Sequence, residues 1–154
     1  MYAKVMVPLD GSKLAECVLP HLRHLAQAKL VKNIVLVRVV EPVQPAAGGE
    51  YVISEEDAKR LNAEHRRDAE DYLQRIASRL KFEGIKVEWK VLFGRVADIL
   101  TDFATEKKMS LVLIATHGRS GVSRWIFGSV ANRLLQSTCV PTLLIRPPEC
   151  KPSW

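Results

Sequence analysis

The segment between residues 111 and 130 combines glycines and a serine in a pattern that could bind an anion. Gly118 follows an apolar run, and Gly128 and Ser129 precede a helical pattern that begins at Val130. A glycine turn exposes backbone N–H groups, and a helix N-terminus adds free donors and a partial positive charge. No Gly-Lys-Ser/Thr sequence is present, so this is not a P-loop. The pattern predicts a phosphate cradle, but glycines that serve only tight turns, with Ser129 as a helix cap, would look the same.

A carboxylate ends the first apolar run, at Asp10-Gly11-Ser12. If this run is a buried strand, Asp10 lies at its carboxyl end and can point into a ligand crevice. The alternative is an aspartate in a turn, satisfied by neighbouring backbone N–H groups. The local sequence favours neither interpretation.

Five runs of apolar and β-branched residues predict strands, four of them continuous and one more alternating. Continuous apolar runs are typical of strands buried on both faces, as in parallel sheets covered by helices. The runs are residues 3–9, 33–40, 86–92, 111–116 and 141–145.

Helical patterns separate these runs, after residue 12 and over residues 55–80, 96–106 and 130–137. Ser54 and Asp57 are placed to cap the longest of them. Pro20 falls inside the first pattern, where we expect a kink because proline lacks a backbone donor. Alternating strands and helices predict an α/β fold with an open, doubly wound, five-stranded parallel sheet and helices on both faces. Ligands of such sheets bind outside the strand ends where the winding switches, here after the first and fourth strands.

Length and composition indicate one globular domain of residues 1–147 with a tail of residues 148–154, from a chain of 154 residues. The net charge of +6 is scattered among acidic residues, which argues against nucleic-acid binding. There is no signal-peptide pattern and no apolar stretch long enough to span a membrane. The odd number of cysteines, three, favours a reducing compartment, and we expect a cytoplasmic protein in which Cys139 packs as a small hydrophobe.

The chain resembles the universal stress protein family over nearly its whole length. The stretch ending in Asp10-Gly11-Ser12 resembles the family's first-strand signature, and residues 91–94 resemble the end of its third strand. The nucleotide-binding branch carries Gly, two residues, Gly, nine residues, then Gly followed by Ser or Thr. Gly118 and Gly128–Ser129 match that spacing, and Ala115 replaces the first glycine.

This resemblance implies the adenine nucleotide alpha hydrolase-like fold, with strand order 3-2-1-4-5. It also implies site roles: ribose held by Asp10 and the backbone at Ala115, adenine bordered by Pro8 and the backbone of Val39, and phosphates bound by Gly118, Gly128 and Ser129, with Val130 and Arg119 beside them. No catalytic residue is assigned, because His117 lacks partners that would build a triad.

The favoured function is a stress-response module that binds ATP, or AMP or ADP, with Mg²⁺ carried by the phosphates. Slow ATP hydrolysis and a nucleotide-free relative acting through protein contacts stay open as alternatives. The resemblance further implies a homodimer through the last strand, residues 141–145, which begins at Pro141 and would lie at a sheet edge.

Overall fold

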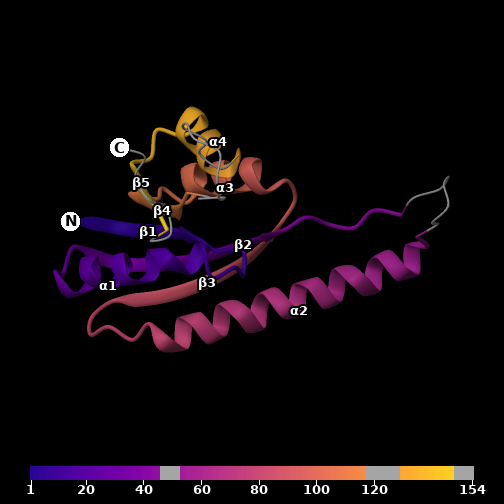
Figure 1. The fold of residues 1–154 in the computed structure, drawn as a ribbon, viewed down its shortest axis with the longest axis horizontal. Coiled ribbons are helices and arrows are strands. Elements are labelled where there is room, and N and C mark those ends of the chain that lie inside the picture. Colours follow the sequence, from indigo (N-terminus) through magenta and orange to yellow (C-terminus); the bar gives the residue numbers. More distant parts are fainter. Residues whose placement is uncertain (46–52, 117–128, 148–154) are drawn as a thin grey trace.

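A five-stranded parallel sheet forms the centre of the computed structural model, which describes residues 1–45, 53–116 and 129–147 (Figure 1). Its strands are β1 (Tyr2–Pro8), β2 (Val31–Val40), β3 (Lys86–Phe93), β4 (Leu111–Ala115) and β5 (Thr142–Ile145). The order β3-β2-β1-β4-β5 confirms the predicted doubly wound arrangement. All four pairings are parallel, so every carboxyl end lies at the same edge of the sheet.

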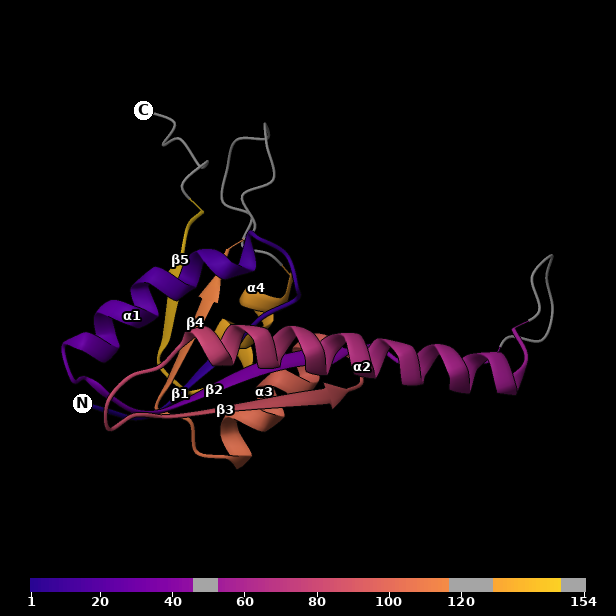
Figure 2. The ribbon, with the colours of Figure 1, turned by 90° about the horizontal axis from the view of Figure 1, so that it is seen from below.

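Helices cover both faces of this sheet, as Figures 1 and 2 show. They are α1 (Leu19–Gln27), α2 (Glu55–Arg79), α3 (Val96–Glu106) and α4 (Ser129–Ser137), with a short 3-10 helix, η1 (Ala15–Val18), before α1. Helices α1 and α2 lie on one face, whereas α3 and α4 lie on the other. In Figure 2, the amino-terminal part of α2 extends past the end of β3.

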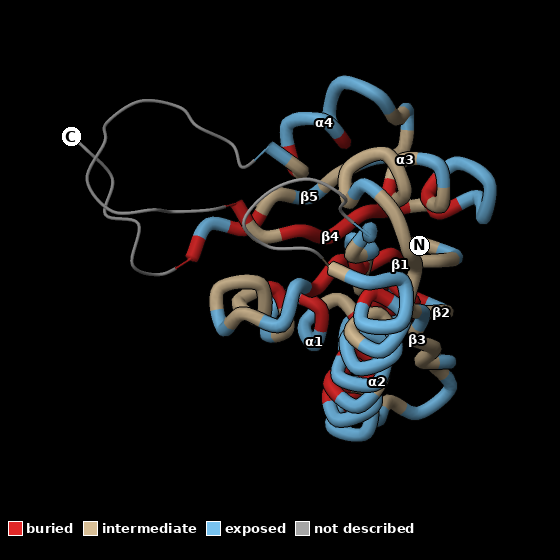
Figure 3. Tube along the Cα trace, turned by 90° about the vertical axis from the view of Figure 1, so that its right-hand side faces the viewer, coloured by how far each residue is buried: buried red, intermediate tan, exposed pale blue. Residues whose placement is uncertain are grey.

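The core has two halves because successive side chains on each strand point to opposite faces. On β2, Ile34 and Leu36 pack toward α1 and α2, while Val35 and Val37 pack toward α3 and α4. Figure 3 shows buried residues following the central strands, with the outer side of α2 exposed. This burial on both faces explains the continuous apolar runs in the sequence.

The helix after β1 differs from the sequence prediction. The expected kink at Pro20 is wrong, because η1 ends at Val18 and α1 begins only at Leu19. Pro20 therefore lies in the first turn of α1, where a backbone donor has no partner within the helix. Ser12 Oγ accepts a hydrogen bond from the Ala15 N–H at 3.0 Å and so stabilises the start of η1.

Two other local predictions have different outcomes. The Ser54 cap of α2 is confirmed, since its Oγ accepts from the Asp57 N–H at 3.0 Å. The predicted burial of Cys139 is wrong, because this residue is exposed in the connection between α4 and β5. That connection turns at the surface, where the Val140 N–H donates to Thr138 Oγ1 at 3.1 Å. Among the described residues, no helix combines the length and apolar character needed to cross a bilayer.

Leu113 provides a test of the two-faced core, because it lies on β4 with no exposed surface. We expect Leu113→Ala to lower the free energy of unfolding by about 2–5 kcal/mol, as cavities in packed cores do. The control Leu135→Ala, at a side chain 42% exposed on α4, should cost less than about 1 kcal/mol. Urea denaturation followed by circular dichroism measures both. Equal losses would contradict this packing.

Candidate functional site

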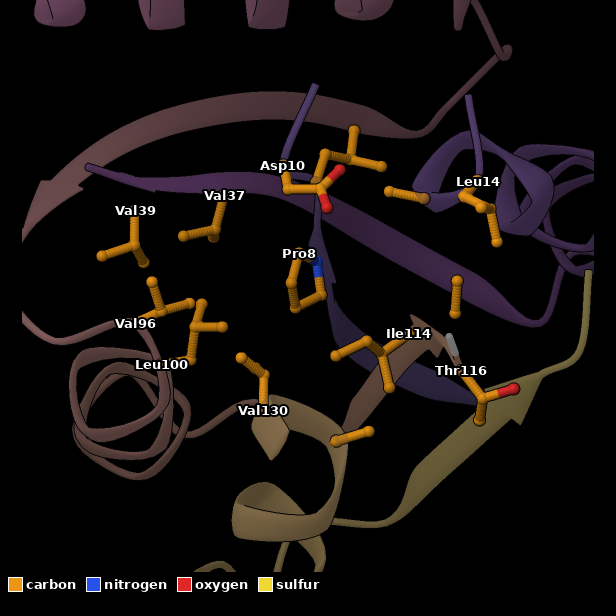
Figure 4. Close-up of a pocket in the computed structure, with 14 residues that line it drawn as sticks. Pro8, Asp10, Leu14, Val37, Val39, Val96, Leu100, Ile114, Thr116 and Val130 are labelled. Atoms are coloured by element: carbon orange, nitrogen blue, oxygen red, sulfur yellow. The ribbon is translucent and has the colours of Figure 1, made fainter. Parts of the chain in front are cut away.

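A pocket of about 110 Å³ opens at the carboxyl ends of β1 and β4, where the sheet winding switches (Figure 4). These two strands are neighbours in the sheet, although their last residues, Pro8 and Ala115, are 107 positions apart in the chain. The lining of the pocket comes from β1 and β4, from β2, α3 and α4, and from the segment that follows β1. The lining residues are Pro8, Leu9, Asp10, Leu14, Ala15, Val37, Val39, Val96, Leu100, Ile114, Ala115, Thr116, Val130 and Ala131.

The interior of the pocket is apolar. Pro8 lies between the side chains that β2 and β4 contribute, while Val96 and Leu100 of α3 face it from the other side, as Figure 4 shows. Such walls suit a flat, weakly polar ring system, whose burial is favoured in proportion to its apolar surface. A volume of about 110 Å³ is well below the roughly 300–1,000 Å³ of pockets that enclose drug-sized ligands. The cavity therefore accommodates a ring, with any larger part of the ligand outside.

Asp10 is the charged group of the pocket lining. Its Oδ1 accepts a hydrogen bond from the Ser12 N–H at 2.8 Å, which is the turn interaction considered above. The same side chain is exposed and lines the pocket, so the turn and the crevice descriptions both apply. The described residues supply no hydrogen bond to Oδ2, which is available to a hydroxyl donor at the pocket rim.

The end of β4 forms another part of the rim. Ala115 is half-buried and lines the pocket where the motif of the nucleotide-binding branch has its first glycine. Thr116 is buried, and its N–H donates to the Ile145 carbonyl at 2.8 Å. This bond extends the pairing of β4 with β5 beyond the strand and holds the backbone at Ala115 in place.

The start of α4 completes the described part of the site. Val130 lines the pocket, and Ser129 is the exposed first residue of the helix. The free N–H groups of a first helical turn favour an anion. The predicted site residues Gly118, Arg119 and Gly128, and also His117, lie outside the described residues.

The structure brings together five of the residues chosen from the sequence: Pro8, Asp10, Val39, Ala115 and Val130 all line one pocket. Sequence reasoning missed Val96 and Leu100, although their apolar spacing on α3 was visible. It also missed Leu14, which follows β1, and Thr116, the residue directly after β4. Over residues 1–45, 53–116 and 129–147, no group of three His, Cys, Asp or Glu residues is arranged to hold a metal ion.

Next to Asp10, the guanidinium of Arg38 on β2 occupies the space where a side chain at Gly11 would extend. Gly11 has a φ of +91°, and a Cβ at this position would lie 3.3 Å from Arg38 Nη1 and 3.4 Å from Cζ and Nη2. The other neighbour of the guanidinium is Tyr72 of α2, whose ring centroid lies 5.3 Å from Cζ. The Tyr72 hydroxyl donates to Glu16 Oε1 at 3.1 Å.

These features define a class of protein: a doubly wound α/β domain with an apolar pocket at the switch point of its sheet, the place where such folds bind ligands. The model of the universal stress protein family matches residues 1–146. This chain therefore belongs to the universal stress protein family.

Individual relatives agree with this assignment. Universal stress protein MJ0531 of Methanocaldococcus jannaschii is 25% identical over 149 residues, which cover 97% of this chain and 85% of the relative. The solved structure of MJ0577, a universal stress protein of the same organism, superposes with a TM-score of 0.80 at 21% identity, covering 97% of this chain and 99% of that one.

Two further solved structures carry a nucleotide. A universal stress protein family protein of Arabidopsis thaliana with AMP bound has a TM-score of 0.67 at 14% identity, covering 96% of this chain and 93% of that one. A universal stress protein in complex with cAMP has a TM-score of 0.63 at 19% identity, covering 94% and 97%. At these identities, the likeness establishes a shared fold.

The packing of Arg38 on Gly11 predicts a difference between two glycine substitutions. Gly11→Ala and Gly84→Ala both place a methyl at positive φ, +91° and +73°, which costs about 1–2 kcal/mol. The surroundings of Gly84 are open within 4 Å, whereas the new methyl at Gly11 meets the Arg38 guanidinium. Urea denaturation should therefore show the larger loss for Gly11→Ala. Equal losses would mean that the guanidinium is not held against the turn.

Proposed function

We propose that this chain is a stress-response module that binds an adenine nucleotide, ATP or its relatives ADP and AMP, at the pocket between β1 and β4. The observation that carries the proposal is an apolar cavity of ring size with one carboxylate at its rim. An adenine ring fills such a cavity, and a ribose provides hydroxyl donors for the carboxylate. The AMP and cAMP complexes of proteins with this fold add support.

Each part of the nucleotide has a proposed partner. The base packs against Pro8 and Val39, and the ribose hydroxyls donate to Asp10 near the backbone of Ala115. The phosphates then lie toward Ser129 and the first turn of α4, whose free N–H groups and dipole favour negative charge. The motif residues Gly118, Arg119 and Gly128 would complete this phosphate site, and Mg²⁺ would be carried by the phosphates.

This function needs no reaction step. A ligand that binds one conformation better than another shifts the protein toward it, and the size of the shift equals the difference in binding free energy. Because the proposed phosphate partners belong to α4 and the motif before it, ligand binding would act on the α4–β5 side of the sheet. The competing possibility is a protein that acts through protein contacts alone, with the Ala115 methyl opposing the ribose.

Nucleotide titration tests the proposal. Protein purified without nucleotide, then stripped, should bind ATP in a calorimeter with one site per chain. Asp10→Ala should weaken binding about tenfold or more, because a charge-assisted hydrogen bond is lost. Asp71→Ala removes a charge of the same kind from the exposed side of α2 and should leave binding unchanged.

Material released on denaturation gives an independent reading of the same question. Chromatography should identify an adenine nucleotide, and Ser129→Ala should reduce the amount retained. Stripped wild-type protein that ignores millimolar ATP would overturn the nucleotide proposal and favour the protein-contact alternative.

We also propose that two copies associate through β5. This strand is one edge of the sheet, and its residue Leu143 is 41% exposed, so unpaired backbone groups and apolar surface lie together. Antiparallel pairing of two such edges across a two-fold axis gives the backbone groups hydrogen-bond partners and buries the apolar surface.

Light scattering on a sizing column tests the association. The wild type should have twice the chain mass of 17.3 kDa, and Leu143→Asp should return it to one chain. Leu30→Asp, at a leucine also 41% exposed but placed before β2, should remain dimeric. A wild-type protein of single-chain mass at micromolar concentration would refute the dimer.

A further inference from the structure

Arg38 joins three elements around the turn that carries Asp10. It lies on β2, two residues after Leu36, so its side chain leaves the sheet on the face covered by α1 and α2. Its guanidinium fills the space where a Gly11 side chain would extend and also lies over the Tyr72 ring of α2, with Cζ 5.3 Å from the ring centroid. Three guanidinium atoms lie at nearly equal distances, 3.3–3.4 Å, from the Cβ position of Gly11, which shows that the flat face of the group meets the turn.

Tyr72 gives this arrangement a fixed support. Its side chain is only 7% exposed, and its hydroxyl donates to Glu16 Oε1 at 3.1 Å. Burial and the Glu16 carboxylate raise the pKa of Tyr72 above its usual value, with a smaller contribution from Asp10. The phenol therefore stays protonated and keeps its donor role at physiological pH. Glu16 belongs to η1, whose first residue Ala15 donates its N–H to Ser12 Oγ, so the hydrogen bond of Tyr72 to Glu16 anchors the helix that is tied to the Asp10 turn.

We propose that Arg38 is a positioning residue for ribose recognition: placed over the Tyr72 ring and beside Gly11, it holds the turn that aims the Asp10 carboxylate at the pocket. This inference rests on the proposed nucleotide function. The left-handed conformation of Gly11 is one that the chain adopts at little cost only at glycine, and the missing side chain is what allows the guanidinium to approach. Loosening this contact frees the turn and lets the carboxylate leave the rim.

The planar shape of the arginine is essential in this account. A flat guanidinium can lie over an aromatic ring and close beside a glycine at the same time, which a compact ammonium group does less well. Arg38→Lys therefore keeps the charge and most of the apolar stem but loses the flat group that meets both neighbours. Arg38→Met keeps the stem and loses the charge as well.

The test compares two ligands rather than one. ATP carries both ribose hydroxyls, whereas 2′,3′-dideoxy-ATP lacks them. The dissociation constant of the dideoxy ligand divided by that of ATP therefore reports the hydroxyl contact alone. In the wild type this ratio should be about ten or more, and Asp10→Ala should bring it close to one. Arg38→Met and Arg38→Lys should move the ratio toward one, mainly because they weaken the binding of ATP. Arg75→Met, at an exposed arginine of α2, should retain the wild-type ratio.

If Arg38 had only a general structural role, its loss would weaken the binding of both ligands equally and leave the ratio unchanged. Thermal unfolding checks that each variant is folded. If Arg38→Met does not fold, the result for Arg38→Lys decides between the two roles. Wild-type discrimination that persists in the folded Arg38 variants overturns the inference while the proposed function stands. A wild type that binds neither ligand refutes the proposed function itself, and the inference with it.

Discussion

The parallel pairing of β1 with β4 is the constraint on which the rest of the structure depends. The two strands meet through the pairs Val5–Leu111 and Met6–Val112. From this pair the sheet grows in two directions, through β2 and β3 on one side and through β5 on the other. A crossover helix lies on a given face according to the handedness of its connection, so α1 and α2 cover one side and α3 and α4 the other. The carboxyl ends of β1 and β4 lie side by side at this switch point, and the pocket opens there.

This geometry sets what the site can recognise. The two strands and α3 bring apolar side chains to the pocket, while the turn after β1 brings the carboxylate of Asp10 and α4 brings the positive end of a helix. A ligand that matches all three has a flat ring, hydroxyl donors and an anionic group, in that order. Adenine nucleotides have this order of groups, which is why we favour them over a ligand that is only apolar or only anionic.

Much of this arrangement could be predicted from the sequence, and the reason is periodicity. Continuous apolar runs located the strands, and the resemblance to the family implied that Asp10, Val39 and Ala115 would lie at one site. Local context decided what could not be predicted. Pro20 lies in the first turn of α1 because η1 ends at Val18 and α1 begins at Leu19, and Cys139 is exposed because its connection turns at the surface.

Contacts between distant segments could not be predicted from the sequence, for a different reason. Periodicity shows that Val96 and Leu100 share a face of α3, but not that this face closes the ligand pocket. The contact of Tyr72 with Glu16 spans 56 positions of the chain, and Arg38 of β2 lies over the same tyrosine ring. Such contacts follow from the side of the sheet on which each helix packs, and that is a property of the whole fold.

Methyl NMR with AMP as the added ligand tests the central claim most directly. Our account predicts that resonances of Val37, Val39, Val96, Leu100 and Ile114, which line the pocket, shift on titration and saturate together. Methyls of Leu22, Leu73 and Ile76, which pack on the opposite face of the sheet, should stay in place. Unchanged pocket resonances at millimolar AMP, or shifts confined to the opposite face, would contradict the account.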